Sequence, residues 1–217
     1  MDDLPASTTV TAIRAARRGR QVTIELSDGQ TFLCSEEACT RAGVVAGAEV
    51  TPETLAALEA AEQRVLAHEA ALRLLSHRAR SEREIRQRLA QRGVIPDAVE
   101  AEVRRLREAG LVDDEKFARA WVEDRRQSAP RGRRMLRYEL LSRGIATESI
   151  DQATEGVDDL ETARALALRK GRAVHATEYE AFFAKVGNFL RGKGFDYAVA
   201  AEATRAAWAE LDDRPRP

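Results

Sequence analysis

One pattern of apolar residues and glycine occurs three times along this chain, at nearly constant spacing. Each copy has an apolar residue, a leucine four positions later, a glycine four positions after that, and then another apolar residue: Ile85/Leu89/Gly93/Val94, Leu136/Leu140/Gly144/Ile145 and Val186/Leu190/Gly194/Phe195. Residues four apart share a helix face, and glycine ends a helix in the left-handed conformation at least cost. The glycines lie 51 and then 50 residues apart. A period of this length predicts an array of helical units rather than a coiled-coil seam.

Capping signals place further helices around each copy. Ser81 and Glu84 form a capping box before Ile85, and Asp97 with Glu100 predicts the start of a third helix that Gly110 ends. Helix starts at Asp113 and at Asp158 or Asp159 open the next two units. The predicted organisation is a β-rich region at 1–50, a connecting helix at 51–69, three-helix repeats at 70–112, 113–157 and 158–211, and a frayed tail at 212–217.

The first fifty residues follow a different pattern, with a period of two. Val22, Ile24 and Leu26 alternate with polar residues, and the turn at 27–30 leads into a second run at 31–34, which predicts a hairpin. A third strand is predicted at 9–13, with a turn at 17–20, and Ser35 is predicted to cap a short helix that stops near Gly43. The fold class expected is therefore mainly α, with a small N-terminal β-containing region.

Thr51 and Pro52 form a strong helix start, so a long helix is expected from there toward Ser76. Its apolar residues form an interrupted helical stripe that joins the β-rich region to the first repeat; they are Leu55, Leu58, Val65, Leu72 and Leu75.

Charge is distributed unevenly although the net charge of the 217 residues is only −1. Residues 61–150 carry twenty Lys and Arg against fifteen acids, whereas the segments on either side are net acidic. No stretch is apolar for long enough to span a membrane, and the N-terminus lacks a signal-peptide pattern, so a cytoplasmic protein without a membrane partner is expected. Cys34 and Cys39 fit neither a zinc site nor a disulfide framework, and reduced structural thiols are expected.

The strongest candidate binding surface is the segment 125–137, which contains six arginines and no acid: Arg125, Arg126, Arg131, Arg133, Arg134 and Arg137. Pro130 and Gly132 predict a loop that enters the middle helix of the second repeat. Guanidinium groups there could reach phosphates or the carboxylates of a partner. The alternative is a solvated basic loop balanced by Glu123 and Asp124. Because uncompensated like charges are costly without a partner, we favour the binding role.

No constellation indicates an enzyme, a cofactor or a metal site. The spacing Gly187, Gly192, Lys193 superficially matches a phosphate-binding loop, but Gly194 follows where Ser or Thr is needed, and the match falls inside a predicted helix. The three histidines are scattered, without acids or thiols at metal-ligand spacing. The acidic pairs 113–114 and 158–159 stand at helix starts, where capping is the simpler role.

Residues 107–118, from Arg107 to Ala118, are similar to the signature of the RecX family, regulators of the RecA recombinase. The same resemblance continues through Arg125, Gly132, Leu136, Leu140, Gly144 and Ile145, and residues 74–76 and 81–89 resemble the first unit of that family. It covers about residues 68–210.

The resemblance implies tandem three-helix repeats in an elongated, curved array that binds in the groove of the RecA–DNA filament and inhibits its ATPase and strand exchange. The partners expected from it are the RecA filament and, weakly and without sequence preference, single- and double-stranded DNA. A monomer is the default, because no heptad seam is present. The alternative is a stand-alone DNA-binding protein of the helix-turn-helix type at 85–106, although acids at 97, 100 and 102 would meet phosphates unfavourably.

Overall fold

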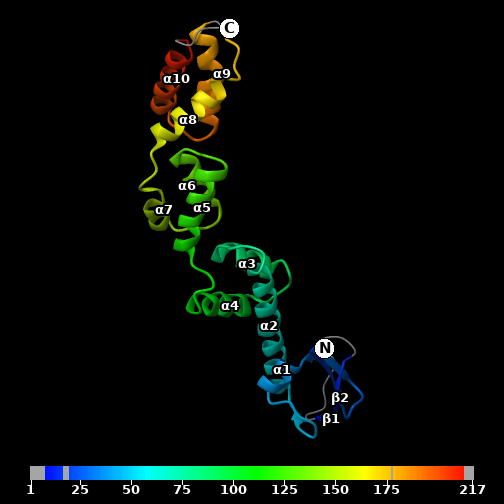
Figure 1. Ribbon diagram of the computed structural model, residues 1–217. Helices are drawn as coiled ribbons and strands as arrows, with labels where there is room; N and C mark the ends of the chain where they lie inside the picture. Colours follow the sequence, from blue (N-terminus) through cyan, green and yellow to red (C-terminus); the bar gives the residue numbers. More distant parts are fainter. Residues whose placement is uncertain (1–7, 17–19, 177, 213–217) are drawn as a thin grey trace. The chain divides into compact units, whose positions relative to one another are not determined.

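The structure is a computed structural model that describes residues 8–16, 20–176 and 178–212 (Figure 1). The chain divides into two compact units, Met1–Val112 and Asp113–Pro217. The predicted turn at 17–20 and the predicted frayed tail fall almost entirely outside the described residues. Within the described part, no helix is both long and apolar enough to cross a membrane.

The first unit begins with a small antiparallel sheet, as the alternating pattern predicted. Its strands are β1 (Thr8–Ala15), β2 (Gln21–Leu26), β3 (Thr31–Ser35) and β4 (Glu49–Val50), in the order β3-β2-β1-β4. The hairpin of β2 and β3 is confirmed, with Ile24 opposite Phe32 and Val22 opposite Cys34. The sequence missed β4, because two residues are too few to show a period of two.

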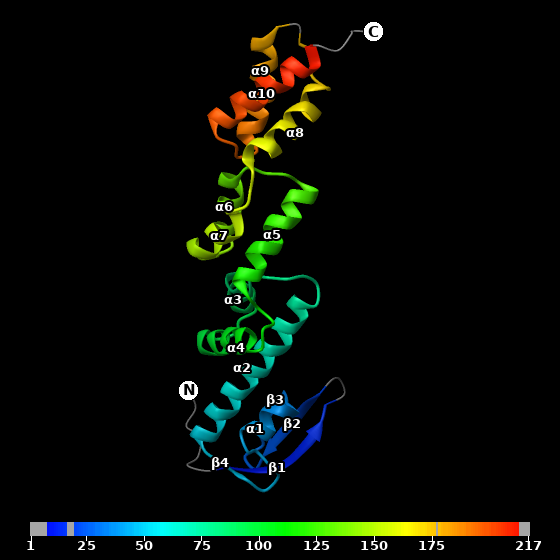
Figure 2. The ribbon, with the colours of Figure 1, turned by 60° about the vertical axis from the view of Figure 1, so that its left-hand side comes forward.

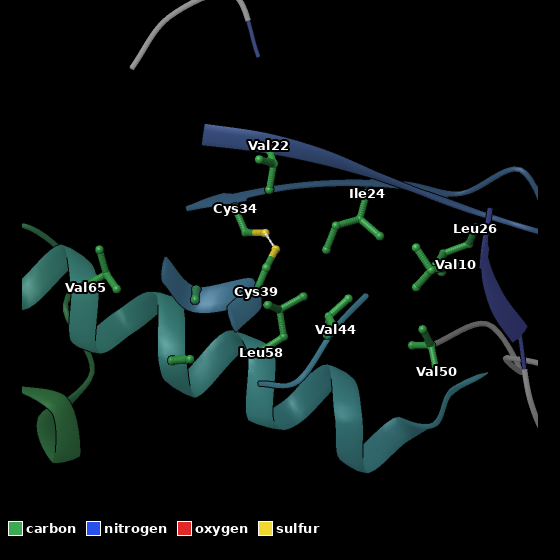
Figure 3. Packing of buried hydrophobic residues seen from close by; sticks show 12 residues of the cluster. Val10, Val22, Ile24, Leu26, Cys34, Cys39, Val44, Val50, Leu58 and Val65 are labelled. Carbon is green, nitrogen blue, oxygen red and sulfur yellow. Dashed lines mark hydrogen bonds between the residues drawn. The ribbon is translucent and has the colours of Figure 1, made fainter. Parts of the chain in front are cut away.

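One face of the sheet is buried against two helices, α1 (Glu36–Arg41) and the first half of α2 (Pro52–Leu75). Figure 3 shows Val22 and Ile24 pointing from the sheet toward Leu58 and Val65 on α2. Ser35 caps α1 as predicted, accepting a hydrogen bond from the backbone N–H of Ala38 at 3.1 Å. These side chains form a core separate from that of the first three-helix repeat.

Helix α2 buries different sides along its length. Leu58, Ala61 and Val65 pack in the core of the β region, whereas Ala67, Ala70, Ala71 and Leu74 pack with the helices that follow. Residues 65 and 67 lie about 200° apart on a helix, so the buried side changes between them. The predicted single stripe is therefore wrong at Leu72, whose surface is 42% exposed.

The first repeat is completed by α3 (Glu82–Ala90) and α4 (Pro96–Glu108), which pack on the second half of α2 (Figure 2). Ser81 caps α3 by accepting from the backbone N–H of Glu84 at 3.2 Å. The prediction that Asp97 starts α4 is wrong by one residue, since Pro96 takes the first helical position. Proline fits there because its missing N–H would be unpaired in any case.

The second unit contains two further three-helix repeats. The second repeat comprises α5 (Asp114–Ser128), α6 (Arg133–Ser142) and α7 (Thr147–Thr154), and the third comprises α8 (Asp159–Gly171), α9 (Tyr179–Gly192) and α10 (Tyr197–Asp212). The three repeat glycines, Gly93, Gly144 and Gly194, all have positive φ, between 79° and 95°, and end the middle helix of their repeats as the pattern predicted.

The second and third repeats approach each other closely at two glycines. The N–H of Gly132, just before α6, donates to the carbonyl oxygen of Lys193 at 3.0 Å. A Cβ at Gly132 would lie 2.5 Å from the carbonyl oxygen of Gly194, and a Cβ at Gly194 would overlap Met135. Glycine is required at both positions, because the turn after α9 lies directly against the start of α6.

Candidate interaction surface

The six arginines of segment 125–137 do not form a single cationic face. They follow the end of α5, the loop after it and the start of α6, all within the second unit. Arg125, Arg126 and Arg131 line one open groove of about 390 Å³, whereas Arg133, Arg134 and Arg137 line another of about 720 Å³. The two sets have different partners.

Glu139 on α6 holds two of the arginines inward. Its Oε2 accepts from Trp121 Nε1 at 2.8 Å and from Arg125 Nε at 2.9 Å, and its Oε1 lies 3.8 Å from Arg131 Nε. The guanidinium carbons of Arg125 and Arg143 lie 4.1 and 3.6 Å from the centroid of the Trp121 ring, in cation–π geometry. Arg125 and Arg131 are therefore part of the packing of the second repeat.

Two other arginines pair with acids at the surface. Arg126 Nε lies 2.9 Å from Glu123 Oε2, and Arg137 pairs with Asp151 on α7. Hydrogen bonds from Arg126 and then Gln127 lower the pKa of the Glu123 carboxyl. The Arg126 side chain is 73% exposed. Exposed pairs of this kind contribute little to stability, so a partner's carboxylate or phosphate could replace Glu123 at little cost.

Arg133 links the second and third repeats. Its backbone N–H donates to Asp159 Oδ1 at 2.9 Å, and its guanidinium Nη2 donates to the carbonyl oxygen of Val157 at 2.8 Å. Burial raises the pKa of the Asp159 carboxyl, although the hydrogen bond from Arg133 opposes this shift. Of the predicted capping pair, Asp158 does cap α8, accepting from the N–H of Glu161 at 2.9 Å, whereas Asp159 caps α6 across the two repeats.

Arg134 differs from the other five. Its side chain is exposed on α6, and among the described residues it has no ion-pair or hydrogen-bond partner. The groove beside it is not cationic overall, since three arginines face four acids there: Glu155, Asp158, Asp159 and Asp196. The geometry thus leaves Arg126 and Arg134 as the most accessible cations of the segment, and an intermolecular role for the six stays a prediction.

The other sequence candidates have structural surroundings that explain them. Gly187 lies buried inside α9, so the spacing that resembles a phosphate-binding loop belongs to a helix. The start of α4, which a helix-turn-helix would place in DNA, carries Asp97 and an exposed Glu100 whose Oε1 lies 2.9 Å from Arg86 Nε. These acids disfavour contact with a phosphate backbone.

Three further groups have partners that the sequence did not suggest. The Sγ atoms of Cys34 and Cys39 are 3.0 Å apart in the core of the β region, where burial raises the pKa of the Cys34 thiol to about 12. A thiol of this kind is unreactive. In the first repeat, His68 Nδ1 lies 2.9 Å from Oε1 of the buried Glu102, an acid that needs such a partner to be buried.

Comparison with known proteins follows the same division into repeats. The family model described as "RecX, first three-helix domain" matches residues 67–106, and "RecX, second three-helix domain" matches residues 113–153. The second match contains all six arginines of the segment 125–137.

Several curated relatives carry the name Regulatory protein RecX. The one from Mycobacterium ulcerans is 37% identical over 149 residues, 67% of this chain and 86% of the relative, and the one from Streptomyces coelicolor is 34% identical over 142 residues, 64% and 76%. The one from Clostridium perfringens strain 13 is 25% identical over 194 residues, 87% and 91%.

Solved structures show the same fold. A crystal structure of regulatory protein RecX superposes with a TM-score of 0.73 and 26% identity, covering 92% of this chain and 99% of that one. The crystal structure of RecX from Lactobacillus salivarius superposes with a TM-score of 0.62 at 20% identity, covering 69% of this chain and 99% of that one. Tandem three-helix repeats preceded by a small strand region are thus the fold of this chain.

Proposed function

Because the chain belongs to the RecX family, we propose that it is a non-enzymatic regulator that binds in the groove of a RecA–DNA filament and suppresses the filament's ATPase and strand exchange. The observation that carries the proposal is the match of both RecX three-helix domains to this chain's first two repeats. Successive repeats along one chain can contact successive protomers of a filament, and each added contact strengthens the others.

The proposed contact surface is the arginine segment, with unequal roles for its members. Arg126 and Arg134 have exposed side chains and are the arginines best able to meet acids or phosphates of the filament. Arg125 and Arg131 act indirectly, because Glu139 holds them in the second repeat. Arg133 and Arg137 are intermediate in their availability to a partner. The Arg133 guanidinium already donates to the carbonyl oxygen of Val157, and the Arg137 guanidinium pairs with Asp151.

The same proposal includes weak DNA binding, a monomeric state and a cytoplasmic location. Three arginines against four acids in the larger groove give no strong field for phosphates. We therefore expect DNA binding to be salt-dependent and independent of sequence, and the recombinase to be the principal partner.

The test is the single-stranded-DNA-dependent ATPase of the cognate RecA, titrated with the full chain at amounts well below those that coat the DNA. Inhibition at these amounts is the expected result. The double substitution Arg126→Gln with Arg134→Gln should raise the concentration needed for half-inhibition by about tenfold, the size expected when exposed charged contacts are lost at an interface.

Arg83→Gln is the matched control, because Arg83 occupies in α3 the position that Arg134 occupies in α6, and it is also exposed. Equal inhibition by the double variant and the wild type would refute the assignment of the arginines. No inhibition by the wild type, together with tight binding to one DNA sequence, would replace the proposal with the stand-alone DNA-binding function.

A further inference from the structure

Helix α6 presents an unusual outward side. Tyr138 is 69% exposed and Leu141 is 47% exposed, and Arg134 lies one turn before Tyr138. Positions 134, 138 and 141 fall within about 60° of one another around a helix, opposite the buried Leu136 and Leu140. We call these three residues the Tyr138 face.

The equivalent positions of the other two repeats show that a three-helix unit does not need this face. Counting back from the repeat glycines aligns Tyr138 with Gln87 and Asn188, and all three positions are exposed. The remaining equivalents, also exposed, are Arg83 and Ala90 in the first repeat and Ala184 and Arg191 in the third. Only the second repeat places an aromatic and a branched aliphatic side chain there, at the cost of exposing apolar surface to water.

The Tyr138 face has no partner within the described part of the chain. The ring of Tyr138 makes no ring–ring or cation–π contact there, and its hydroxyl makes no hydrogen bond. Tyr197, which is 65% exposed, differs in this respect, because its ring lies 6.3 Å from that of Phe183. Arg134 likewise forms no ion pair or hydrogen bond within the described part of the chain, although acids line the groove beside it, so the face offers an unpaired cation next to apolar surface.

Charge and shape indicate the class of partner. A nucleic-acid backbone would gain little from Leu141, and the groove beside Arg134 carries more acids than arginines. A protein surface can cover Tyr138 and Leu141 with apolar side chains and present one carboxylate to Arg134. Tyrosine and arginine are, with tryptophan, the residues enriched among those that dominate the binding energy of protein interfaces.

We propose that the Tyr138 face is a protein-docking surface for an apolar patch flanked by a carboxylate on the recombinase, with Tyr138 as its main anchor. This inference rests on the proposed function, because the recombinase is the partner assigned there. It differs from that proposal in locating the main contact on apolar surface of α6 rather than on the arginine charges.

The experiment measures binding of the full-length chain to preformed RecA filaments on single-stranded DNA. Tyr138→Asn introduces the residue that the third repeat carries at the same exposed position, so folding should be retained. We expect filament binding to weaken at least tenfold while the thermal unfolding midpoint and the affinity for naked single-stranded DNA stay unchanged. Asn188→Ala and Tyr197→Ala are matched controls that should bind like the wild type.

Each of the following outcomes would contradict the proposal. Unchanged filament binding by Tyr138→Asn, with the wild type binding, overturns this inference alone. An equal loss of affinity for naked DNA would show that Tyr138 stacks on bases. Failure of the wild type to bind filaments refutes the proposed function and this inference together.

A second measurement tests the proposal if the Tyr138→Asn variant does not fold. A photoreactive benzoylphenylalanine placed at position 138 should crosslink to the recombinase within the filament, whereas the same group at position 197 should not. Absence of a recombinase adduct at 138 overturns the proposal.

Discussion

The second and third repeats share one backbone plan but complete their packing with different chemistry. Both have a middle helix with leucine four residues before a left-handed glycine, at Leu140/Gly144 and Leu190/Gly194. In the second repeat, a carboxylate, three guanidinium groups and one indole meet around Glu139. The third repeat has a cluster of five aromatic rings among its described residues, whereas the second has one stacked ring pair, Phe117 and Trp121.

The rings of the third repeat form a continuous cluster. Phe182 and Trp208 lie 5.0 Å apart between centroids with planes at 60°, and Tyr179 lies 6.0 Å from Trp208 in an edge-to-face arrangement. Such pairs are stabilising beyond the area that they bury. This comparison shows that the arginines of a segment can stabilise the fold of their own repeat. The number of arginines in a segment therefore does not by itself identify a binding surface.

The largest effect should come from the third repeat. Phe182→Ala removes a ring that is 2% exposed and should lower the free energy of unfolding by about 3–5 kcal/mol, the usual loss for a buried aromatic residue. Urea unfolding followed by the fluorescence of Trp208, in a Trp121→Phe background, measures it. Phe182→Leu is the control and should lose less, since most of the volume is kept. If Phe182→Ala and Phe182→Leu lowered the free energy of unfolding equally, packing of the aromatic rings would not be what stabilises the third repeat.

The joint between the two repeats comes next. Gly194→Ala adds a Cβ that overlaps Met135 and sits at φ +95°, so we expect a loss of about 3 kcal/mol. Gly93→Ala, at φ +79° with open space around it, should lose only about 1 kcal/mol from backbone strain. Urea denaturation of both variants gives the difference. Similar losses would show that the close approach after α9 is not tight in solution.

Removing the carboxylate at the centre of the second repeat should have an intermediate effect. Glu139→Ala leaves the Trp121 indole N–H and the Nε–H of Arg125 without their acceptor, although Arg125 Nη1 keeps its hydrogen bond to Asp124, and should cost about 1–3 kcal/mol. The fluorescence of Trp121, in a Trp208→Phe background, follows this unfolding. Glu123→Ala removes an exposed partner of Arg126 and should leave stability unchanged. A Glu139 variant as stable as the Glu123 variant would contradict the structural role of Arg125.

The smallest effect concerns Asp159, which belongs to the third repeat but caps α6 of the second. Burial raises the pKa of its carboxyl above the ordinary 3.8, so ionisation opposes folding. This opposition is absent below the ordinary pKa and grows as the pH rises through the raised one. Asp159→Asn, whose Oδ1 can still accept from Arg133, should therefore be slightly more stable than the wild type near neutral pH and equal to it in acid. Thermal unfolding across pH tests this, and a larger difference in acid would refute it.

Much of the fold followed from local signals in the sequence. Ser35, Ser81 and Asp113 cap the helices that they were predicted to cap, and Asp158 is the one of the two candidates 158 and 159 that caps α8, because capping depends on neighbouring residues alone. Helix α4 begins one residue before Asp97, because Pro96 fits the first helical position. The limits of the individual repeats stay predictions.

The candidate surface was less predictable, because the partners of its arginines are distant in sequence. Glu139 lies 14 residues from Arg125 and 18 from Trp121, and Asp159 lies 26 from Arg133, so only the folded chain reveals these pairs. The sequence alone does distinguish Tyr138, because the other two repeats have the polar residues Gln87 and Asn188 at the equivalent position. Its exposure, however, required the structure.

The change of buried side along α2 also bears on how such a chain can be shortened or recombined with relatives. A cut after Val65 would leave Leu58, Ala61 and Val65 with the β region and Ala67, Ala71 and Leu74 with the first repeat, but it would break one continuous helix into two shorter pieces that are less stable on their own. A cut after Leu75 keeps that helix but leaves its alanine-rich side bare. We therefore expect gene fusions that exchange repeats among relatives to tolerate a crossover near Val112 better than one within α2.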